Sequence, residues 1–350
     1  MHADHINGLP GLLSTISAGE GNVLPDKQDP RLEQSRQLRP TEIYGPSGLR
    51  EFLRVNFRLT HTVLTRPYVV HELLFNDEQT FEGTLHASER QGRDIRQTDG
   101  VWKKFASING VDVSAGPILH TIPCLGYIFE EQPRPLPLQP SLYVPHLKKP
   151  INAQALMKQG ISNPLSILST LTRDRQPVTL EDGTVLEPPG MSGSGRKLVV
   201  LGDTYDAAPC IPLSQDADLI VHESTNAYLP TIDESQQIGK KNSNGIEISF
   251  ETVQELAKEH GHSTPQVAGQ FAKSCQAKQL VLNHLSVKYP DFGQEPNLDD
   301  GKVDREGPGT KMSRLALKEI ARLATKSWSP SNGQQAIVAR DFLEIEIPRR

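Results

Sequence analysis

The fold class is set by a short apolar stretch, Lys197-Leu-Val-Val-Leu-Gly202, in which β-branched residues lead into a glycine. A run of this length and composition predicts a buried strand. Two similar stretches follow it along the chain, Asp218-Leu-Ile-Val221 and Leu280-Val-Leu-Asn283. Helical patterns lie between them, at Phe250 to His260 and at Thr264 to Cys275. Strands that alternate with helices in this way predict an α/β fold.

Signals of the same kind extend toward both ends of the chain. We expect a strand at Thr41 to Tyr44, a helix at Ser47 to Asn56, extended chain at Val63 to Leu74, a helix at Met312 to Thr325 and a closing strand at Phe342 to Ile347. Thr264 is expected to cap its helix, with Pro265 at the first helical position. A polar segment from Gly19 to Arg39 is expected to be a surface loop.

Length and composition exclude several classes of protein. The 350 residues suffice for one large or two small domains. No apolar run approaches the roughly 18 residues that span a bilayer, which excludes a membrane-spanning protein. Three widely spaced cysteines exclude a disulfide framework and a cysteine-only zinc site, and they indicate a reducing compartment. With a formal net charge of -5, a nucleic-acid partner would need a local basic patch.

One such patch lies in a proline-rich stretch. Glu131 to Gly195 contains ten of the 27 prolines, so it can form neither a core sheet nor a long helix. From Arg134 to Arg175 it carries six basic residues and one acidic residue, Asp174. A local excess of positive charge suits contact with phosphate groups, although a solvated linker would have a similar composition.

Histidines that lie beside carboxylates in the sequence are the residues that indicate metal binding or catalysis. His2-Ala3-Asp4-His5 places three potential metal ligands on one short loop. Alone, this motif could simply cap the helix that follows it. Five further motifs occur after it, in this order: Leu119-His120, Gly202-Asp203-Thr204, Val221-His222-Glu223, Gly261-His262-Ser263 and Asn283-His284-Leu285. Together they indicate a site for one or two metal ions.

This ordered set resembles the metallo-β-lactamase superfamily and, within it, the short form of ribonuclease Z, the tRNA 3′-processing endonuclease. The resemblance extends over most of residues 1 to 290. It rests on Ile6 to Leu13 after His5, on Tyr44-Gly-Pro-Ser-Gly-Leu49, on His262-Ser-Thr264 and on Asn283-His-Leu-Ser-Val-Lys-Tyr289. Asn283 and Lys288 depart mildly from the family pattern. The resemblance implies an αβ/βα sandwich of two packed mixed sheets with an incomplete first half-sheet and a protruding basic arm.

The resemblance also implies a division of the chain. Residues 1–130 would be the truncated N-terminal part of the metallo-β-lactamase-like domain, 131–195 the inserted arm or exosite, and 196–350 the C-terminal half. In the family a further histidine lies two residues before His2, where Met1 is only the spacer, and several strands precede it. We therefore expect the chain to be N-terminally truncated. The expected location is cytoplasmic or nuclear, with a mitochondrial location left open.

The implied site holds two zinc ions per chain. The ligands would be His2, Asp4, His5, His120, Asp203 and His284, with Asp203 bridging the ions. Asp4 would also accept a proton from the attacking water. His262, oriented by Glu223, would be the general acid. The remaining histidines and the cysteines are expected to be ordinary core or surface residues.

The resemblance implies removal of the 3′ trailer of precursor tRNA after the discriminator base, which leaves a 3′ hydroxyl. The expected RNA-binding residues are Lys148, Lys149, Lys158, Arg173 and Arg175. The arm would contact the tRNA elbow for the other subunit of a homodimer. Two alternatives stay open: an impaired remnant that keeps a tRNA-binding or dimerising surface, and another superfamily hydrolase acting on a thioester, a lactone or a generic phosphodiester.

Overall fold

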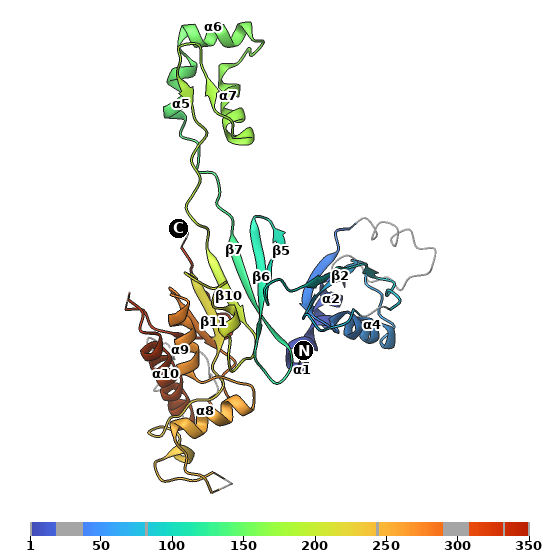
Figure 1. Ribbon diagram of the computed structural model, residues 1–350, viewed down its shortest axis with the longest axis vertical. Coiled ribbons are helices and arrows are strands. Elements are labelled where there is room, and N and C mark those ends of the chain that lie inside the picture. The colour runs from blue at the N-terminus through green and yellow to red at the C-terminus, as the bar shows by residue number, and fades with distance from the viewer. Residues whose placement is uncertain are drawn as a thin grey trace, which may run out of the picture. The chain divides into compact units, whose positions relative to one another are not determined.

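The computed structural model describes residues 2–18, 38–80, 83–242, 245–289, 308–331 and 333–348 (Figure 1). The chain forms two compact units: Met1–Phe129 with Lys197–Ile347, and Glu130–Arg196 with Pro348–Arg350. The polar loop predicted at residues 19–39 lies outside the described residues except for its last two positions. None of the described helices is long and apolar enough to cross a membrane.

The smaller sheet of the first unit has four parallel strands. Its central strand β2 (Tyr68–Leu74) pairs with β1 (Thr41–Pro46), β3 (Glu89–Arg90) and β4 (Asp94–Arg96). Every residue of β2 is buried, as expected for a strand that is covered on both faces. Helices α2 (Gly8–Ala18) and α4 (Leu49–Leu59) pack on one face through a cluster of Leu13, Leu49, Leu53, Phe57, Leu64, Tyr68 and Val70.

The larger sheet has seven strands in the order β13-β12-β11-β10-β7-β6-β5. Its strands are β5 (Trp102–Ile108), β6 (Val111–Ile118), β7 (Cys124–Glu131), β10 (Lys197–Leu201), β11 (Leu219–Glu223), β12 (Leu280–Asn283) and β13 (Ile337–Val338). Strands β10 to β13 pair in parallel and β5 with β6 antiparallel, so the sheet is mixed. The predicted strands at 197–202, 218–221 and 280–283 are confirmed.

Helices cover the larger sheet on one face and the smaller sheet packs on the other. Helix α9 (Pro265–Ser274) and helix α10 (Pro308–Trp328) share a core with β10, β11 and β12 (Figure 1). Helix α8 (Phe250–Glu259) precedes them. Leu73 of the smaller sheet is buried in one cluster with Trp102, Val113 and Leu125 of the larger. The predicted sandwich of two sheets with helices outside is therefore confirmed.

One local expectation was wrong. The strand predicted at Phe342 to Ile347 is absent: residues 343–348 form no strand, and the last described strand is β13. Phe342 adopts a left-handed φ of 61° at a turn, after which alternate apolar side chains are half-buried. The alternation thus identified inward-facing residues but not a strand. Thr264 is the N-cap residue of α9 with Pro265 in its first turn, as expected, although the Thr264 side chain makes no capping hydrogen bond.

The second unit has a core of its own. It contains α5 (Pro140–Leu147), α6 (Pro150–Lys158), η1 (Pro164–Ser166), α7 (Ile167–Ser169), η2 (Thr170–Asp174) and a hairpin of β8 (Val178–Thr179) with β9 (Val185–Leu186). Its apolar core consists of Leu147, Leu156, Ile167, Leu171, Leu180 and Leu186. The proline-rich stretch forms short helices because several of its prolines lie at helix starts, where proline is tolerated.

An ion pair joins the two chain ends of this unit. The Arg196 guanidinium donates to both carboxylate oxygens of Glu131, at 2.9 and 2.5 Å. This hydrogen bonding lowers the pKa of Glu131 to about 2. The entering and leaving strands are thereby held side by side.

The contact between α9 and α10 depends on Gly269, where an added Cβ would overlap the carbonyl oxygen of Ala324. We expect Gly269→Ala to destabilise the protein by about 1–3 kcal/mol, because the two helices would have to separate. The matched control is Gly11→Ala in α2, where a Cβ meets nothing within 4 Å. That variant should be neutral or slightly stabilising. Denaturant unfolding measures both, and equal midpoints would contradict the packing argument.

Candidate metal centre

Three side chains that can bind a metal or transfer a proton lie at the carboxyl ends of the parallel strands of the larger sheet. Asp203 lies two residues after β10, Glu223 is the last residue of β11, and His284 directly follows β12. Because β10, β11 and β12 are parallel neighbours, their carboxyl ends share one edge of the sheet. Side chains distant in sequence therefore meet there, as ligands commonly do at this edge of α/β sheets.

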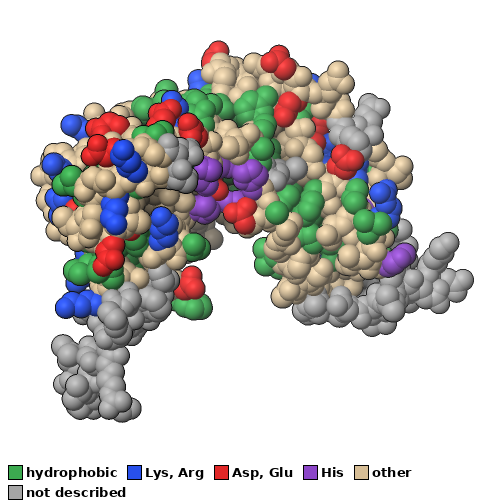
Figure 2. Space-filling model, turned by 90° about the horizontal axis from the view of Figure 1, so that it is seen from below, with side chains coloured by type: hydrophobic (Ala, Val, Ile, Leu, Met, Phe, Trp, Pro, Cys, Tyr) green, Lys and Arg blue, Asp and Glu red, His purple; other side chains and the backbone are tan. Residues whose placement is uncertain are grey.

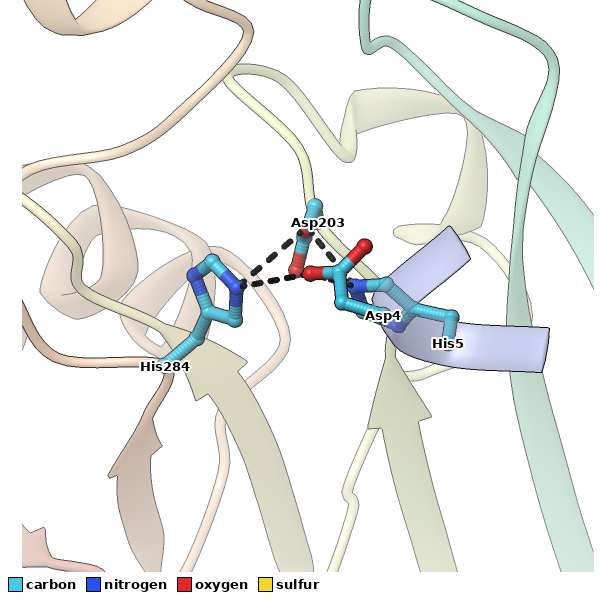
Figure 3. Close-up of side chains that lie close together, drawn as sticks. All are labelled: Asp4, His5, Asp203 and His284. Atoms are coloured by element: carbon cyan, nitrogen blue, oxygen red, sulfur yellow. Dashed lines mark hydrogen bonds and ion pairs between the residues drawn. The ribbon is translucent and has the colours of Figure 1, made fainter. Parts of the chain in front are cut away.

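The N-terminal motif reaches the same edge from the other side. The one-turn helix α1 (Ala3–Ile6) carries Asp4 and His5. His5 Nε2 lies 2.9 Å from Asp203 Oδ2, and His284 Nε2 lies 3.5 Å from the same oxygen (Figure 3). Asp4 Oδ2 lies 3.4 Å from His5 Nε2 and 3.8 Å from His284 Nε2. The four side chains point toward one small region, where their ligand atoms lie within 4.8 Å of one another.

A second group shares Asp203 with the first. His2 Nδ1 lies 3.0 Å from His120 Nε2, and both belong to a cluster with Asp203. His120 Nδ1 donates to the Gly261 carbonyl at 2.7 Å, since a carbonyl can only accept. The Nε2 lone pair of His120 is therefore directed at the cluster. Burial and His120 lower the pKa of His2, which favours the neutral imidazole that binds metals.

Gly261 is required by this arrangement. Its φ is 84°, in the left-handed region that favours glycine. A Cβ at this position would overlap the His120 ring, which the Gly261 carbonyl holds in place. The chain therefore needs glycine immediately before His262.

The third group pairs His262 with Glu223. His262 Nδ1 donates to Glu223 Oε1 at 3.0 Å, and the Glu223 side chain is only 1% exposed. The hydrogen bond to Glu223 raises the pKa of His262. Burial opposes ionisation of Glu223, but hydrogen bonds from His262, Thr225 and the Thr204 backbone outweigh it and lower the pKa of Glu223. The pair thus favours a protonated histidine beside the other two groups.

Thr225 is a site residue that the sequence analysis missed. Its hydroxyl lies 2.7 Å from Glu223 Oε2 and 2.8 Å from His284 Nδ1. If Thr225 donates to the carboxylate, His284 Nδ1 can donate to Thr225, which turns the Nε2 lone pair of His284 toward Asp203. His284 itself has a left-handed φ of 50°. The one feature of the sequence that could have indicated this role is the position of the Thr225 hydroxyl, two residues after Glu223.

The structure brings together all six side chains expected to bind metal, with the His262–Glu223 pair beside them. Asp203 is 5% exposed, whereas Asp4 is 64% and His5 40% exposed, so the cluster opens to solvent on the side of α1. Figure 2 shows histidine side chains gathered in a hollow of the surface. A cavity of about 470 Å³ adjoins them. Imidazole nitrogen and carboxylate oxygen are a donor set that zinc accepts.

His222 is not part of the cluster, in keeping with its expected role as a core residue. It is fully buried, and its Nδ1 donates to the Glu223 carbonyl at 2.7 Å. Its ring lies 5.5 Å from that of Phe271 on α9. Burial lowers the pKa of His222, so this histidine is neutral. Cys210 and Cys275 are buried apolar residues as well, whereas Cys124 is half-buried.

The five residues expected to bind RNA lie in the second unit, and three of them have partners there. Lys149 Nζ lies 2.8 Å from Asp182 Oδ2, and Arg173 Nε lies 2.9 Å from Asp174 Oδ1. Arg175 donates to the Pro189 carbonyl. Lys148 and Lys158 form no ion pair with any residue that the structure describes.

The positive charge expected for this segment is larger than the net charge of the folded unit. The predicted window ended at Arg175 and omitted Glu181, Asp182 and Glu187, which follow it directly. The turn after β8 brings Asp182 to Lys149, which lowers the pKa of Asp182. The unit as a whole is therefore only weakly basic.

Known proteins are similar to this chain over most of its length. Zinc phosphodiesterase ELAC protein 1 of Bos taurus is 32% identical over 367 residues, covering 99% of this chain and 82% of that protein. Ribonuclease Z of Streptococcus suis is 29% identical, covering 83% and 70%. The crystal structure of the short form of human tRNase Z (ELAC1) matches with a TM-score of 0.44 and 28% identity, covering 83% and 71%. No protein-family model matches. The chain belongs to the family of the ELAC protein 1 zinc phosphodiesterases and ribonucleases Z.

Proposed function

We propose that this protein is a zinc-dependent endoribonuclease that removes the 3′ trailer of precursor tRNA and leaves a 3′ hydroxyl. The observation that carries the proposal is the sharing of Asp203 by two histidine groups, with the His262–Glu223 pair beside them. The names of the relatives, zinc phosphodiesterase and ribonuclease Z, support the same chemistry. The second unit, which we propose to bind RNA, would have no role in a thioesterase or a lactonase.

The donor set fits two zinc ions. Asp4, His5, Asp203 and His284 would hold one, and His2, His120 and Asp203 the other. Three protein ligands with an open position are common in catalytic zinc sites. When bound, a pair of zinc ions activates water near neutral pH and neutralises charge on a phosphodiester.

The side chains of the protein would move the protons. Asp4 is exposed on α1 and accepts a proton from the water that attacks phosphorus. The bond between phosphorus and the 3′ oxygen of the last retained nucleotide breaks. His262, protonated and held by Glu223, donates its proton to that oxygen. The products are a tRNA with a 3′ hydroxyl and a trailer with a 5′ phosphate.

The second unit is proposed to bind the body of the tRNA, acting for the other subunit of a homodimer. Lys148 is the C-cap residue of α5, and Lys158 is the last residue of α6. Both ammonium groups are exposed. Lys149 is committed to Asp182, so we propose that it mainly holds the hairpin on α6. Phosphate binding by this unit therefore falls chiefly to Lys148 and Lys158.

Removal of the shared carboxylate tests the metal centre. We expect Asp203→Asn to lower the zinc content from two ions per chain to fewer than one, because both groups use this side chain. Asp206→Asn is the control, since Asp206 caps the Ala208 backbone and lies outside the cluster. Elemental analysis after dialysis gives the stoichiometry. At most one zinc in the wild-type chain would favour the impaired remnant.

The pH dependence of cleavage tests the His262–Glu223 pair. A general acid must be protonated, so activity should fall as the pH rises through the pKa of His262. Glu223→Gln removes the charge that raises this pKa, and the alkaline limb should move to lower pH. Glu259→Gln, on an exposed carboxylate in α8, should leave the profile unchanged. An equal loss of activity at every pH would assign Glu223 a purely structural role.

Salt dependence tests the second unit. We expect Lys148→Ala and Lys158→Ala each to weaken binding of precursor tRNA and to reduce its log-log salt slope by up to about 0.9. Hydrolysis of methyl p-nitrophenyl phosphate should not change, since that small substrate has no tRNA body for the second unit to bind. Filter binding at several salt concentrations provides the slopes. Equal loss on both substrates would place these lysines in a structural role.

A further inference from the structure

An aromatic ring and a cation outside the metal centre lie on the two segments that carry Asp203 and His262. Lys258 Nζ, near the end of α8, is 6.0 Å from the centroid of the Tyr205 ring. The ring is half-buried and the lysine is exposed. Within the described ranges, no carboxylate pairs with Lys258. Neither residue is used by the mechanism proposed above.

Backbone hydrogen bonds fix this pair against the site. Tyr205 lies two residues after Asp203, and its backbone amide donates to the Leu119 carbonyl at 2.9 Å, directly before His120. On the other side, the Gly261 amide donates to the Lys258 carbonyl at 2.9 Å. Lys258 is thus one turn before His262, the proposed general acid. The backbones of Tyr205 and Lys258 are therefore bonded to the segments that carry His120 and His262.

We propose, as an inference that rests on the proposed function, that Tyr205 and Lys258 together hold the last nucleotide retained by the tRNA. We call this pair of residues the platform. The Tyr205 ring stacks on its base, and the Lys258 ammonium pairs with the phosphate on its 5′ side. Stacking of this kind accepts any base, because every base has a π-face. The lysine stem is flexible, so its ammonium group can move from the ring to a phosphate when the base arrives.

The placement of the two residues gives them a positioning role. His262 must meet the 3′ oxygen of this same nucleotide, and a stacked base fixes its sugar relative to the acid. Neither residue offers a pattern of donors and acceptors specific for one base. The platform should therefore recognise a single-stranded nucleotide end and not its sequence.

The test uses the full chain loaded with zinc and a tRNA that ends in 2-aminopurine at the last retained position. This RNA is the product of the proposed cut and cannot be cut again. Stacking on Tyr205 should quench its fluorescence on binding. We expect Tyr205→Leu to abolish the quenching and to weaken binding about fivefold or more, whereas Tyr205→Phe keeps both.

The lysine is tested in the same titration. Lys258→Met should lower the log-log salt slope by about 0.7, and Lys258→Arg should restore it. Lys273→Met, at the end of α9 distant from His262, is the control and should leave the slope unchanged. Thermal unfolding of each variant separates a lost contact from a lost fold, and the Lys258 variants change no buried atom.

The outcomes separate the platform from the proposed function. Full quenching by a folded Tyr205→Leu variant, or an unchanged slope for Lys258→Met, would overturn the platform even if precursor tRNA is cut normally. A wild-type protein that neither binds nor cuts tRNA would overturn both proposals. Loss of quenching with hydrolysis of methyl p-nitrophenyl phosphate intact would support the platform.

Discussion

The site depends on one buried carboxylate. Asp203 is 5% exposed, and imidazoles from the N-terminal motif, from the segment after β6 and from the end of β12 converge on it. A buried anion is costly unless polar or charged partners surround it. The histidines supply partners in the protein alone, and cations would supply stronger ones. The N-terminal helix α1 is thus joined to the larger sheet at a point where charge balance, and not apolar packing, determines which groups lie in contact.

Parallel pairing is what makes this convergence possible. β10, β11 and β12 end at one edge, so short segments after each strand present Asp203, Glu223 and His284 to the same space. The backbone adopts uncommon conformations at this edge: His284 has a left-handed φ, and Gly261, also left-handed, leaves room for the His120 ring. Such conformations carry a cost and persist only where the surroundings enforce them. The hydrogen bonds of Thr225 and of the Gly261 carbonyl do this for His284 and His120.

The second unit is stabilised by a different set of interactions. It is held by six buried aliphatic side chains and by the bidentate Glu131–Arg196 pair, and ion pairs also join Lys149 to Asp182 and Arg173 to Asp174. Counting basic residues in a window of sequence overstated its positive charge, because the window stopped before the acidic hairpin that folds back onto α6. The distribution of charge on a small folded unit depends on which segments touch, and a linear count contains no such information.

The sequence by itself determined the α/β alternation, the three parallel core strands and the identity of the clustered side chains. Hydrophobic runs and strand-end motifs are local properties, so they can be recognised without coordinates. Only the tertiary structure decided that Thr225 links Glu223 to His284, that Lys149 is committed to Asp182, and that residues 343–348 form no strand. It also decided that Lys258 lies over the Tyr205 ring. These are contacts between segments distant in sequence, and their geometry is set by packing, which no local pattern encodes.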